Sequence, residues 1–223
     1  MLHALRVGLL LGLALIPASW PANASDSTSV PVEEPGSPRV LVLGDSISAA
    51  YGMSLEQGWA ALLERQLKET WDDSQVINAS ISGDTSAGGL RRLPDLLEEH
   101  RPDLVVIELG GNDGLRGYPT QKLEANLTEM AELAAQVGAD VLLLPMEIPP
   151  NYGPRYTRSF RESFQRAASN TDSTLGPFLL EGIATDPALM QDDGIHPTVE
   201  AQPMITRILQ PVIEELLGQH TSS

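Results

Sequence analysis

The sequence predicts an α/β fold, in which a parallel β-sheet carries helices on both of its faces. Two observations lead to this prediction. Short apolar segments alternate along the chain with longer segments of helical periodicity, which is the pattern of strand–helix–strand units. The apolar segments are also continuous instead of alternating with polar residues, as expected for strands covered on both faces. The sequence shows neither an internal repeat nor a second domain.

The first expected strands and helices lie in the N-terminal half of the folded region. Residues 39–43 are apolar after the first position and predict a buried strand. Residues 59–71 place Trp and Leu side chains near helical spacing, and residues 75–79 form a short strand candidate. Residues 89–99 predict a helix with its leucines on one face.

The middle of the chain carries the clearest patterns. Residues 103–109, DLVVIEL, predict the most distinct strand, and residues 140–146, DVLLLPM, predict another buried strand. Between them, residues 121–137 predict an amphipathic helix. This helix should end at Gly138, in the position after the C-cap where glycine is favoured.

The last three elements complete the alternation. Residues 160–168 predict a helix, and residues 177–180 predict a weak strand. Residues 199–217 predict a final helix that is closed by Gly218.

The N-terminal segment, residues 1–24, is typical of a cleavable secretory signal peptide. A weakly basic start precedes an apolar run, and Ala22 and Ala24 supply the small residues that signal peptidase accepts. The alternative is a transmembrane anchor, but the run is shorter than the ~20 residues that a membrane span requires. We therefore expect cleavage after Ala24, a periplasmic or secreted protein, and no stable membrane anchor.

Composition limits the remaining chain in three ways. Residues 25–37 are rich in Ser, Pro and Glu and predict a flexible leader before a domain at residues 38–218, with a disordered tail at residues 219–223. The absence of cysteine excludes disulfides and Cys-ligated zinc. A formal charge of −16 disfavours nucleic acid and anionic lipid as partners. Nothing indicates more than a monomer.

Four polar segments follow the predicted strands or precede the last helix. They contain Ser46 in GDSIS, Gly83 in SGDTSAGG, Asn112 in GGNDGLRG, and the pair Asp193 and His196 in DDGIHP. In a parallel sheet these segments should meet at the carboxyl edge, where ligands bind. Each segment alone is ambiguous, since GDS is equally a capped turn and a nucleophile-bearing turn.

The combination of residue types indicates acyl transfer. A serine hydroxyl needs a base, and His196 is the candidate, since the other three histidines lie in the N-terminal segment, the C-terminal tail or the charged end of a helix. Asp193, three residues earlier, can orient the imidazole. The N–H of Ser46, placed at the start of a helix, the N–H of Gly83 and the amide of Asn112 are candidate donors to an oxyanion.

The four segments resemble, in order, the sequence blocks of the SGNH (GDSL-type) hydrolases. ELGGNDGLRG, PPNYGPRY and DDGIHPTVEAQP are similar to the bacterial periplasmic thioesterase I, lysophospholipase L1 and arylesterase subgroup. The resemblance implies a three-layer α/β/α, flavodoxin-like fold with a five-stranded parallel sheet. It implies Ser46 as nucleophile, Asp193 and His196 as its partners, and Ser46, Gly83 and Asn112 as the oxyanion hole. Ile47 departs from the usual Leu, and no metal or cofactor is implied.

The expected function is a serine esterase or thioesterase that acts on a small-molecule acyl ester, such as an aryl ester, an acyl-thioester or a lysophospholipid. The alternatives are a carbohydrate acetyl-esterase of the same fold and a metal-dependent hydrolase using Asp192, Asp193 and His196. Residues 114–119 form either a mobile lid or a plain turn. The residues expected to contact the acyl group are Leu109, Gly110, Met146, Ile148, Pro149, Pro150 and Tyr152, although residues 146–152 could instead form a rigid proline-rich crossover.

Overall fold

The computed structural model describes residues 37–220 and contains one five-stranded sheet in these residues. The strand order is β2-β1-β3-β4-β5, and every pairing is parallel. The expected parallel α/β fold with five strands is therefore confirmed. The strands are β1 (Arg39–Gly44), β2 (Gln75–Asn78), β3 (Leu104–Glu108), β4 (Asp140–Leu143) and β5 (Thr174–Leu175).

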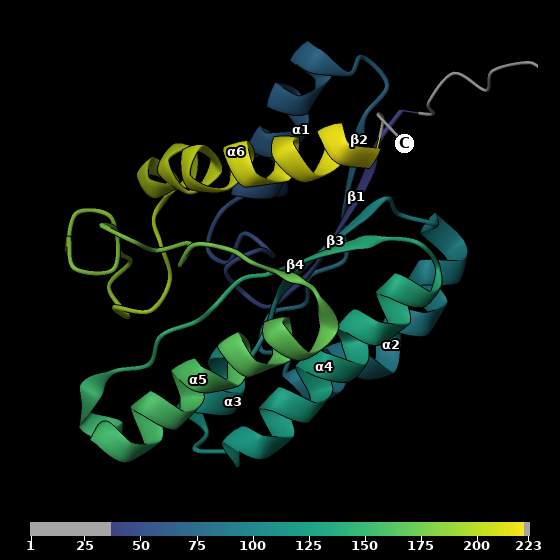
Figure 1. Ribbon diagram of the computed structural model, residues 1–223. Helices are drawn as coiled ribbons and strands as arrows, with labels where there is room; N and C mark the ends of the chain where they lie inside the picture. The colour runs from purple at the N-terminus through teal and green to yellow at the C-terminus, as the bar shows by residue number, and fades with distance from the viewer. Residues whose placement is uncertain (1–36, 221–223) are drawn as a thin grey trace, which may run out of the picture. The chain divides into compact units, whose positions relative to one another are not determined.

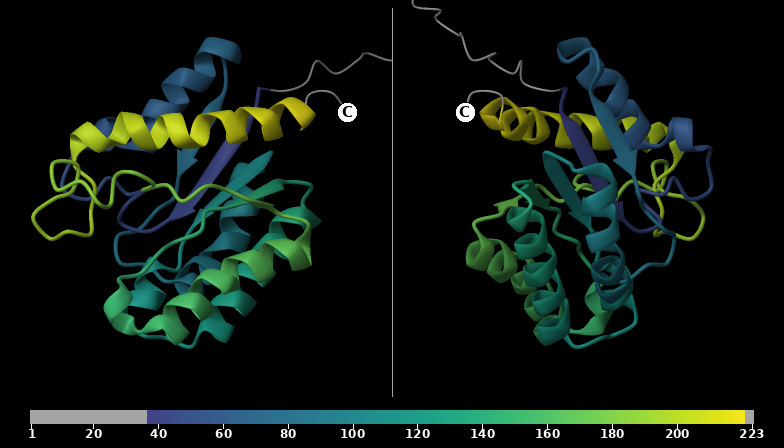
Figure 2. Two further views of the ribbon diagram at one scale, coloured as in Figure 1. Left: turned by 60° about the vertical axis from the view of Figure 1, so that its left-hand side comes forward. Right: turned by 90° about the vertical axis from the view of Figure 1, so that its right-hand side faces the viewer.

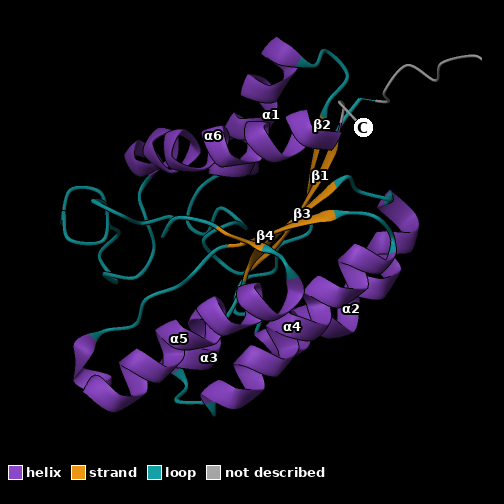
Figure 3. Cartoon of the chain, viewed as in Figure 1, coloured by secondary structure: helices purple, strands orange, loops and turns teal. Residues whose placement is uncertain are grey.

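Helices cover both faces of the sheet and make a three-layer arrangement (Figure 1). One layer holds α1 and α6, which pack on each other, and the other holds α4 packed between α2 and α5. The strands lie between the two helix layers in the turned views of Figure 2, and Figure 3 colours helices and strands separately in the view of Figure 1. The helices are α1 (Trp59–Thr70), α2 (Ser86–His100), α3 (Gly111–Leu115), α4 (Thr120–Gln136), α5 (Pro154–Thr171) and α6 (Gln202–His220), with 3₁₀ turns η1 (Leu55–Gln57), η2 (Pro150–Tyr152) and η3 (Val199–Ala201).

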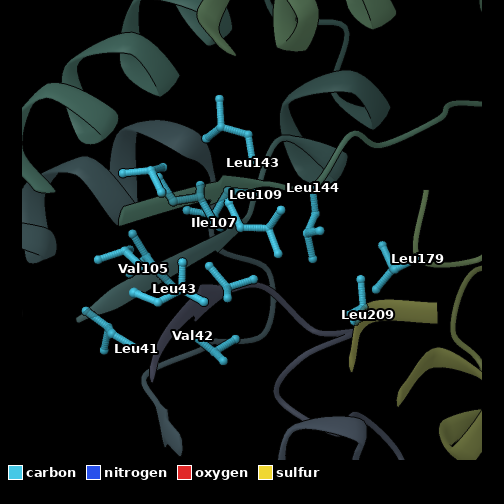
Figure 4. Packing of buried hydrophobic residues seen from close by; sticks show 14 of the residues in the cluster. Leu41, Val42, Leu43, Val105, Ile107, Leu109, Leu143, Leu144, Leu179 and Leu209 are labelled. Atoms are coloured by element: carbon cyan, nitrogen blue, oxygen red, sulfur yellow. The ribbon is translucent and has the colours of Figure 1, made fainter. Parts of the chain in front are cut away.

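The core forms around the two central strands. All five residues of β3 are buried, as are the last five of β1, so the continuous apolar runs correspond to strands covered on both faces. Figure 4 shows their side chains together with leucines that follow β3 and β4. On the α5 side, the rings of Phe160 and Phe164 meet edge to face with centroids 5.4 Å apart. Burial of these side chains fixes the sheet and hence the positions of the loops at its carboxyl edge.

Most expected elements appear with bounds shifted by a few residues, but three expectations were wrong. The fifth strand is Thr174–Leu175, whereas residues 177–180 form an irregular segment in which Leu179 and Leu180 are buried. Its apolar residues reflect burial and not a strand, which a short run cannot distinguish. Helix α5 begins at Pro154, where proline suits the first turn, and not at residue 160. Helix α6 passes through Gly218 to His220 instead of ending at that glycine.

Two other expectations concern the helix ends and the chain termini. Gly138 follows α4 with a φ of +84°, so its predicted place after the C-cap is confirmed. The signal peptide at residues 1–24, most of the leader at 25–37 and the last residues of the tail lie outside the described residues. Within residues 37–220, no helix has the length and apolarity needed to cross a membrane.

Candidate active site

The four polar segments meet at the carboxyl edge of the sheet. Ser46 follows β1, Gly83 follows β2, and Asn112 lies in α3, immediately after β3. His196 lies in the loop that leads to α6. All four line one open pocket of about 900 Å³. Parallel strands place their following loops at one edge, so residues up to 150 positions apart come together.

Ser46, His196 and Asp193 form a hydrogen-bonded series. The Ser46 Oγ lies 2.8 Å from His196 Nε2, and His196 Nδ1 lies 2.6 Å from Asp193 Oδ2. The other carboxylate oxygen, Oδ1, accepts the backbone N–H groups of Ile195 and His196 at 2.9 and 3.0 Å. This arrangement can move a proton from a serine hydroxyl to an imidazole whose tautomer is fixed by a carboxylate.

The ionisation of Asp193 suits this arrangement. Desolvation opposes the charged form, but the hydrogen bonds from the side chain and backbone of His196 and from the Ile195 N–H outweigh it. Together they lower the pKa of Asp193 to about 2. The carboxylate is therefore ionised at neutral pH and can stabilise a protonated imidazole.

The sequence predicted the start of a helix at Ser46, but this was wrong, because the backbone there forms a series of turns. The Ala49 N–H donates to the Asp45 carbonyl at 2.9 Å, and the Tyr51 N–H donates to the Ser46 carbonyl at 3.1 Å. Ala50 then takes a φ of +57°, which is incompatible with a continuing helix. Ile47, at the position where the family usually has Leu, is buried beneath the turn.

Gly83 and Asn112, the two candidate donors that follow β2 and β3, both line the pocket. Gly83 has a φ of +79°, and the nearest atom to a Cβ at this position would be Arg116 Nη2, 3.9 Å away. Asn112 Nδ2 donates one hydrogen to Asp45 Oδ2 at 3.1 Å. An amide nitrogen carries two hydrogens, so the second is left for a group in the pocket.

Two buried carboxyl groups beneath the Ser46 turn were missed by the sequence analysis. Glu108 Oε2, at the end of β3, accepts the hydroxyl of Ser48 at 2.7 Å and the N–H of Asp45 at 3.2 Å. Asp45 in turn accepts the N–H of Ile47 and the amide of Asn112. The carboxyl groups thus tie the serine turn to the neighbouring strand and to Asn112. An acidic residue in the otherwise apolar run VVIEL is the sequence signal that could have identified Glu108.

Burial changes the ionisation of both carboxyl groups. Desolvation raises the pKa of Asp45 to about 6, against the opposing hydrogen bonds from Ile47 and Asn112. Desolvation and the nearby charge of Asp45 raise the pKa of Glu108 well above its ordinary value. Burial thus favours the protonated form of both carboxyl groups, and the charge of Asp45 adds to this preference at Glu108.

Tyr51 and Gln191 are two further neighbours of His196 that the sequence did not indicate. The Tyr51 ring lies against the imidazole with centroids 4.3 Å apart and planes inclined by 32°. Gln191 Nε2 donates to the Tyr51 carbonyl at 2.9 Å. Both contacts join segments about 140 residues apart, so no local motif could have revealed them.

The expected acyl-contacting residues divide into two groups. Met146, Ile148, Pro149 and Pro150 line the pocket together with residues 178 and 180 of the irregular segment. Three expected contacts do not line it. These are Leu109 and Gly110, which are buried among core side chains, and Tyr152, whose hydroxyl donates to the Leu115 carbonyl at 2.7 Å in a separate groove.

Residues 114–119 contact the rest of the domain at Gly114 and Arg116. Gly114 lies inside α3 and is so close to Ile148 and Phe160 that a Cβ would come within 2.6 and 2.7 Å of them. Arg116 Nη2 donates to the Gly83 carbonyl at 3.1 Å. These contacts favour the plain turn over a mobile lid.

The alternative of a metal site at Asp192, Asp193 and His196 finds no support in the geometry. Within residues 37–220, no three His, Asp or Glu side chains are arranged to hold a metal ion. Asp193 instead directs its carboxylate to the imidazole and to backbone N–H groups.

Known proteins with similar sequences include ester hydrolases. The model of the GDSL-like Lipase/Acylhydrolase family matches residues 42–202. Esterase TesA of Pseudomonas aeruginosa is 53% identical over 178 residues, which cover 80% of this chain and 89% of that protein. The arylesterase of Vibrio mimicus is 48% identical over 181 residues, covering 81% and 90%.

Solved structures of similar proteins have the same fold as this chain. A crystal structure of TesA has a TM-score of 0.77 and 52% identity, covering 80% of this chain and 99% of that one. The psychrotrophic esterase EstA of Pseudoalteromonas sp., inhibited by monoethylphosphonate, also has a TM-score of 0.77, with 44% identity and coverage of 81% and 98%.

Proposed function

Because the chain belongs to the GDSL-like Lipase/Acylhydrolase family and is a serine ester hydrolase, we propose that it acts through an acyl-enzyme on Ser46. The observation that carries this proposal is the 2.8 Å contact between Ser46 Oγ and His196 Nε2 across 150 residues of sequence. A hydroxyl this close to an imidazole, in a pocket, has the geometry of an activated nucleophile.

The mechanism follows from the hydrogen bonds. His196 Nε2 accepts the hydroxyl proton while Ser46 Oγ attacks the carbonyl carbon of the ester. Asp193 holds the proton on Nδ1 and stabilises the imidazolium. The imidazolium then gives its proton to the leaving alcohol or thiol. Water, deprotonated by His196, attacks the acyl-enzyme and releases the acid.

The oxyanion formed at each attack requires hydrogen-bond donors. We assign this role to the N–H groups of Ser46 and Gly83 and to the free amide hydrogen of Asn112. Loss of one such donor typically lowers kcat by about 10²–10³-fold. Asn112→Ala is the direct test, because the other two donors belong to the backbone.

The acyl chain of the substrate is expected to lie on the apolar side of the pocket. Met146, Ile148, Pro149 and Pro150 form that side, and apolar area is the main source of affinity for an alkyl chain. Relatives are named arylesterase and thioesterase 1/protease 1/lysophospholipase L1. We therefore propose aryl esters, acyl-thioesters and lysophospholipids as the substrate classes.

A chain-length series of p-nitrophenyl esters and acyl-CoA thioesters tests this substrate assignment. We expect kcat/KM to rise from acetyl to medium chains as more methylene groups become buried. A carbohydrate acetyl-esterase would instead prefer acetyl and lose activity with longer chains.

Ser46→Ala tests the assignment of the nucleophile. We expect p-nitrophenyl butyrate hydrolysis to fall by at least about 10³-fold and labelling by an alkylphosphonate to be lost. Ser169→Ala, at an exposed serine on α5, is the matched control and should retain both. Turnover by Ser46→Ala at the unmodified rate would remove the basis of the proposal.

We also propose that the protein is exported with cleavage after Ala24 and works as a monomer. The length and composition of residues 1–24 support export. N-terminal sequencing of the protein from the periplasmic or culture fraction should begin at Ser25, and light scattering should give the mass of one chain.

A further inference from the structure

We propose that Gln191 is a positioning residue that holds the His196 loop against the Ser46 turn. Gln191 lies outside the four segments that carry the proposed catalytic groups. Within residues 37–220, Gln191 makes no hydrogen bond to Ser46 and none to the imidazole of His196. Its role rests on the bonds that it makes to the backbones of both loops.

Gln191 first closes the loop that carries Asp193 and His196. Its backbone N–H donates to the His196 carbonyl at 2.8 Å. Its backbone carbonyl accepts the Gly194 N–H at 2.9 Å. The loop is thus a short, internally bonded unit, and Gln191 is at its base.

The side chain of Gln191 then attaches this loop to the serine turn. Nε2 donates to the Pro197 carbonyl at 3.0 Å and to the Tyr51 carbonyl at 2.9 Å. The Tyr51 N–H donates to the Ser46 carbonyl at 3.1 Å. A continuous series of hydrogen bonds therefore runs from the nucleophile to the base through Tyr51 and Gln191, separately from the Ser46–His196 contact.

The lack of a side chain at Gly52 gives the Gln191 amide the room that it occupies. Gly52 has a φ of +80°, and a Cβ there would lie 2.5 Å from Gln191 Oε1 and 3.0 Å from Nε2. A larger residue would displace the amide. The Tyr51 ring, on the same turn, covers the imidazole with a centroid distance of 4.3 Å.

This attachment should affect catalysis because Ser46 and His196 both lie on irregular segments. A shift of about 1 Å between reacting groups can lower a rate by about 10²-fold. A residue that fixes two loops relative to each other should therefore change kcat more than KM, since it does not touch the acyl-binding side of the pocket.

The test uses two substitutions in the full chain. Gln191→Met keeps the length of the side chain but removes both donated hydrogen bonds. Gln191→Glu keeps the size and places a carboxylate against two carbonyl oxygens. Gln136→Met, at an exposed glutamine on α4, is the matched control. The readouts are kcat and KM for p-nitrophenyl butyrate, the rate of phosphonylation by an alkylphosphonate, and the thermal midpoint.

We expect Gln191→Met to lower kcat and the phosphonylation rate by about ten- to a hundredfold, with KM within twofold of the unmodified value. Gln191→Glu should lower both rates at least as much, and Gln136→Met should change neither. Unmodified rates in folded Gln191→Met or Gln191→Glu would overturn the proposal. So would a loss confined to KM. If Gln191→Met is unstable, Gln191→Glu decides the outcome.

The inference rests on the proposed roles of Ser46 and His196, and the two can fail separately. Full activity of Ser46→Ala would remove the proposed function itself. Inactive Ser46→Ala together with fully active Gln191 variants would leave that function standing and remove only the positioning role.

Discussion

At the scale of single residues, the unusual feature is a pair of buried carboxyl groups below the nucleophile turn. Asp45 and Glu108 are 3% and 0% exposed, and burial of a charge is unfavourable unless hydrogen bonds compensate for it. Asp45 accepts from Ile47 and Asn112, whereas Glu108 accepts from Ser48 and Asp45. Burial of the pair lowers the stability of the protein, and its hydrogen bonds fix the positions of the serine turn and of the Asn112 amide.

The raised pKa of Asp45 predicts how this stability changes with pH. The pKa is about 6 in the folded protein and about 4 in an unfolded chain. The folded state therefore keeps its proton when the unfolded state has already lost it. Stability associated with Asp45 is present below about pH 4 and is lost as the pH rises through 6, by at most about 3 kcal/mol.

The side chain of Asn cannot ionise, so the variant Asp45→Asn should not lose stability as the pH rises through 6. Relative to the unmodified protein, its free energy of unfolding in urea should increase between pH 4 and pH 7. Asp95→Asn, at an exposed site on α2, controls for the removal of a negative charge. A difference between Asp45→Asn and the unmodified protein that stays constant over this range would contradict the assignment.

A second prediction at this scale concerns the ring of Tyr51. The ring centroid lies 4.3 Å from that of the imidazole, so the ring should stabilise the imidazolium that forms during attack by about 0.5–1 kcal/mol. Tyr51→Leu should therefore lower kcat for p-nitrophenyl butyrate by about two- to fivefold. Tyr51→Phe retains the ring and should keep the rate, so equal losses in both variants would show that the hydroxyl matters instead.

At the scale of elements, the sequence predicted those that have strong periodicity or continuous apolar runs. The bounds of the central strands and of α4 were predicted to within a few residues. A strand buried on both faces gives a continuous apolar run, and a helix buried along one face gives apolar residues at helical spacing. The start of α5 was missed because residues 154–159, PRYTRS, are polar and exposed or half-buried. The two-residue strand β5 was misplaced because Phe178, Leu179 and Leu180 form a more apolar run than the strand itself.

Helix α3 offers a prediction that links packing to activity. A Cβ at Gly114 would lie 2.6 Å from Ile148 Cγ2 and 2.7 Å from Phe160 Cε2. Gly114→Ala should therefore destabilise the protein by about 1–3 kcal/mol. It should also lower kcat, because the same short helix carries Asn112.

Gly218→Ala is the control for this effect. Gly218 lies within α6, and a Cβ there would meet no atom within 4 Å apart from its chain neighbours and the nearby backbone of the helix. The substitution lies in the last turn of the helix, and this variant should keep both its stability and its kcat. Chemical denaturation and ester hydrolysis measure both quantities. Unchanged stability in Gly114→Ala would mean that α3 can move without cost.

At the scale of the whole molecule, the topology explains why the main site residues could be predicted and their supports could not. Ser46, Gly83, Asn112 and His196 each follow or precede a recognisable element, and a parallel sheet brings such segments to one edge. The contacts of Gln191 with Tyr51 and of Glu108 with Ser48 depend on side-chain packing between distant segments. No spacing rule in the sequence encodes that packing.

The charge of the whole chain predicts a difference between substrates. The formal charge is −16, and removal of residues 1–24 with Arg6 would make it −17. The described residues that line the pocket include Asp45, Glu147 and Glu181 but no lysine or arginine. Glu147 is paired with Arg161 at 3.0 Å, so the negative potential comes from Asp45, Glu181 and the net charge of the chain. This potential should oppose the approach of an anionic acyl-CoA and leave a neutral ester unaffected.

Salt is the variable that tests this difference, because the screening length falls from about 30 Å at 0.01 M to about 8 Å at 0.15 M ionic strength. Over this range kcat/KM for butyryl-CoA should rise several-fold, while that for p-nitrophenyl butyrate stays within twofold. Glu181→Gln, at an exposed position on the pocket lining, should raise kcat/KM for butyryl-CoA at low salt and reduce its salt dependence. Parallel salt profiles for the two substrates would mean that the charge of the molecule does not influence substrate choice.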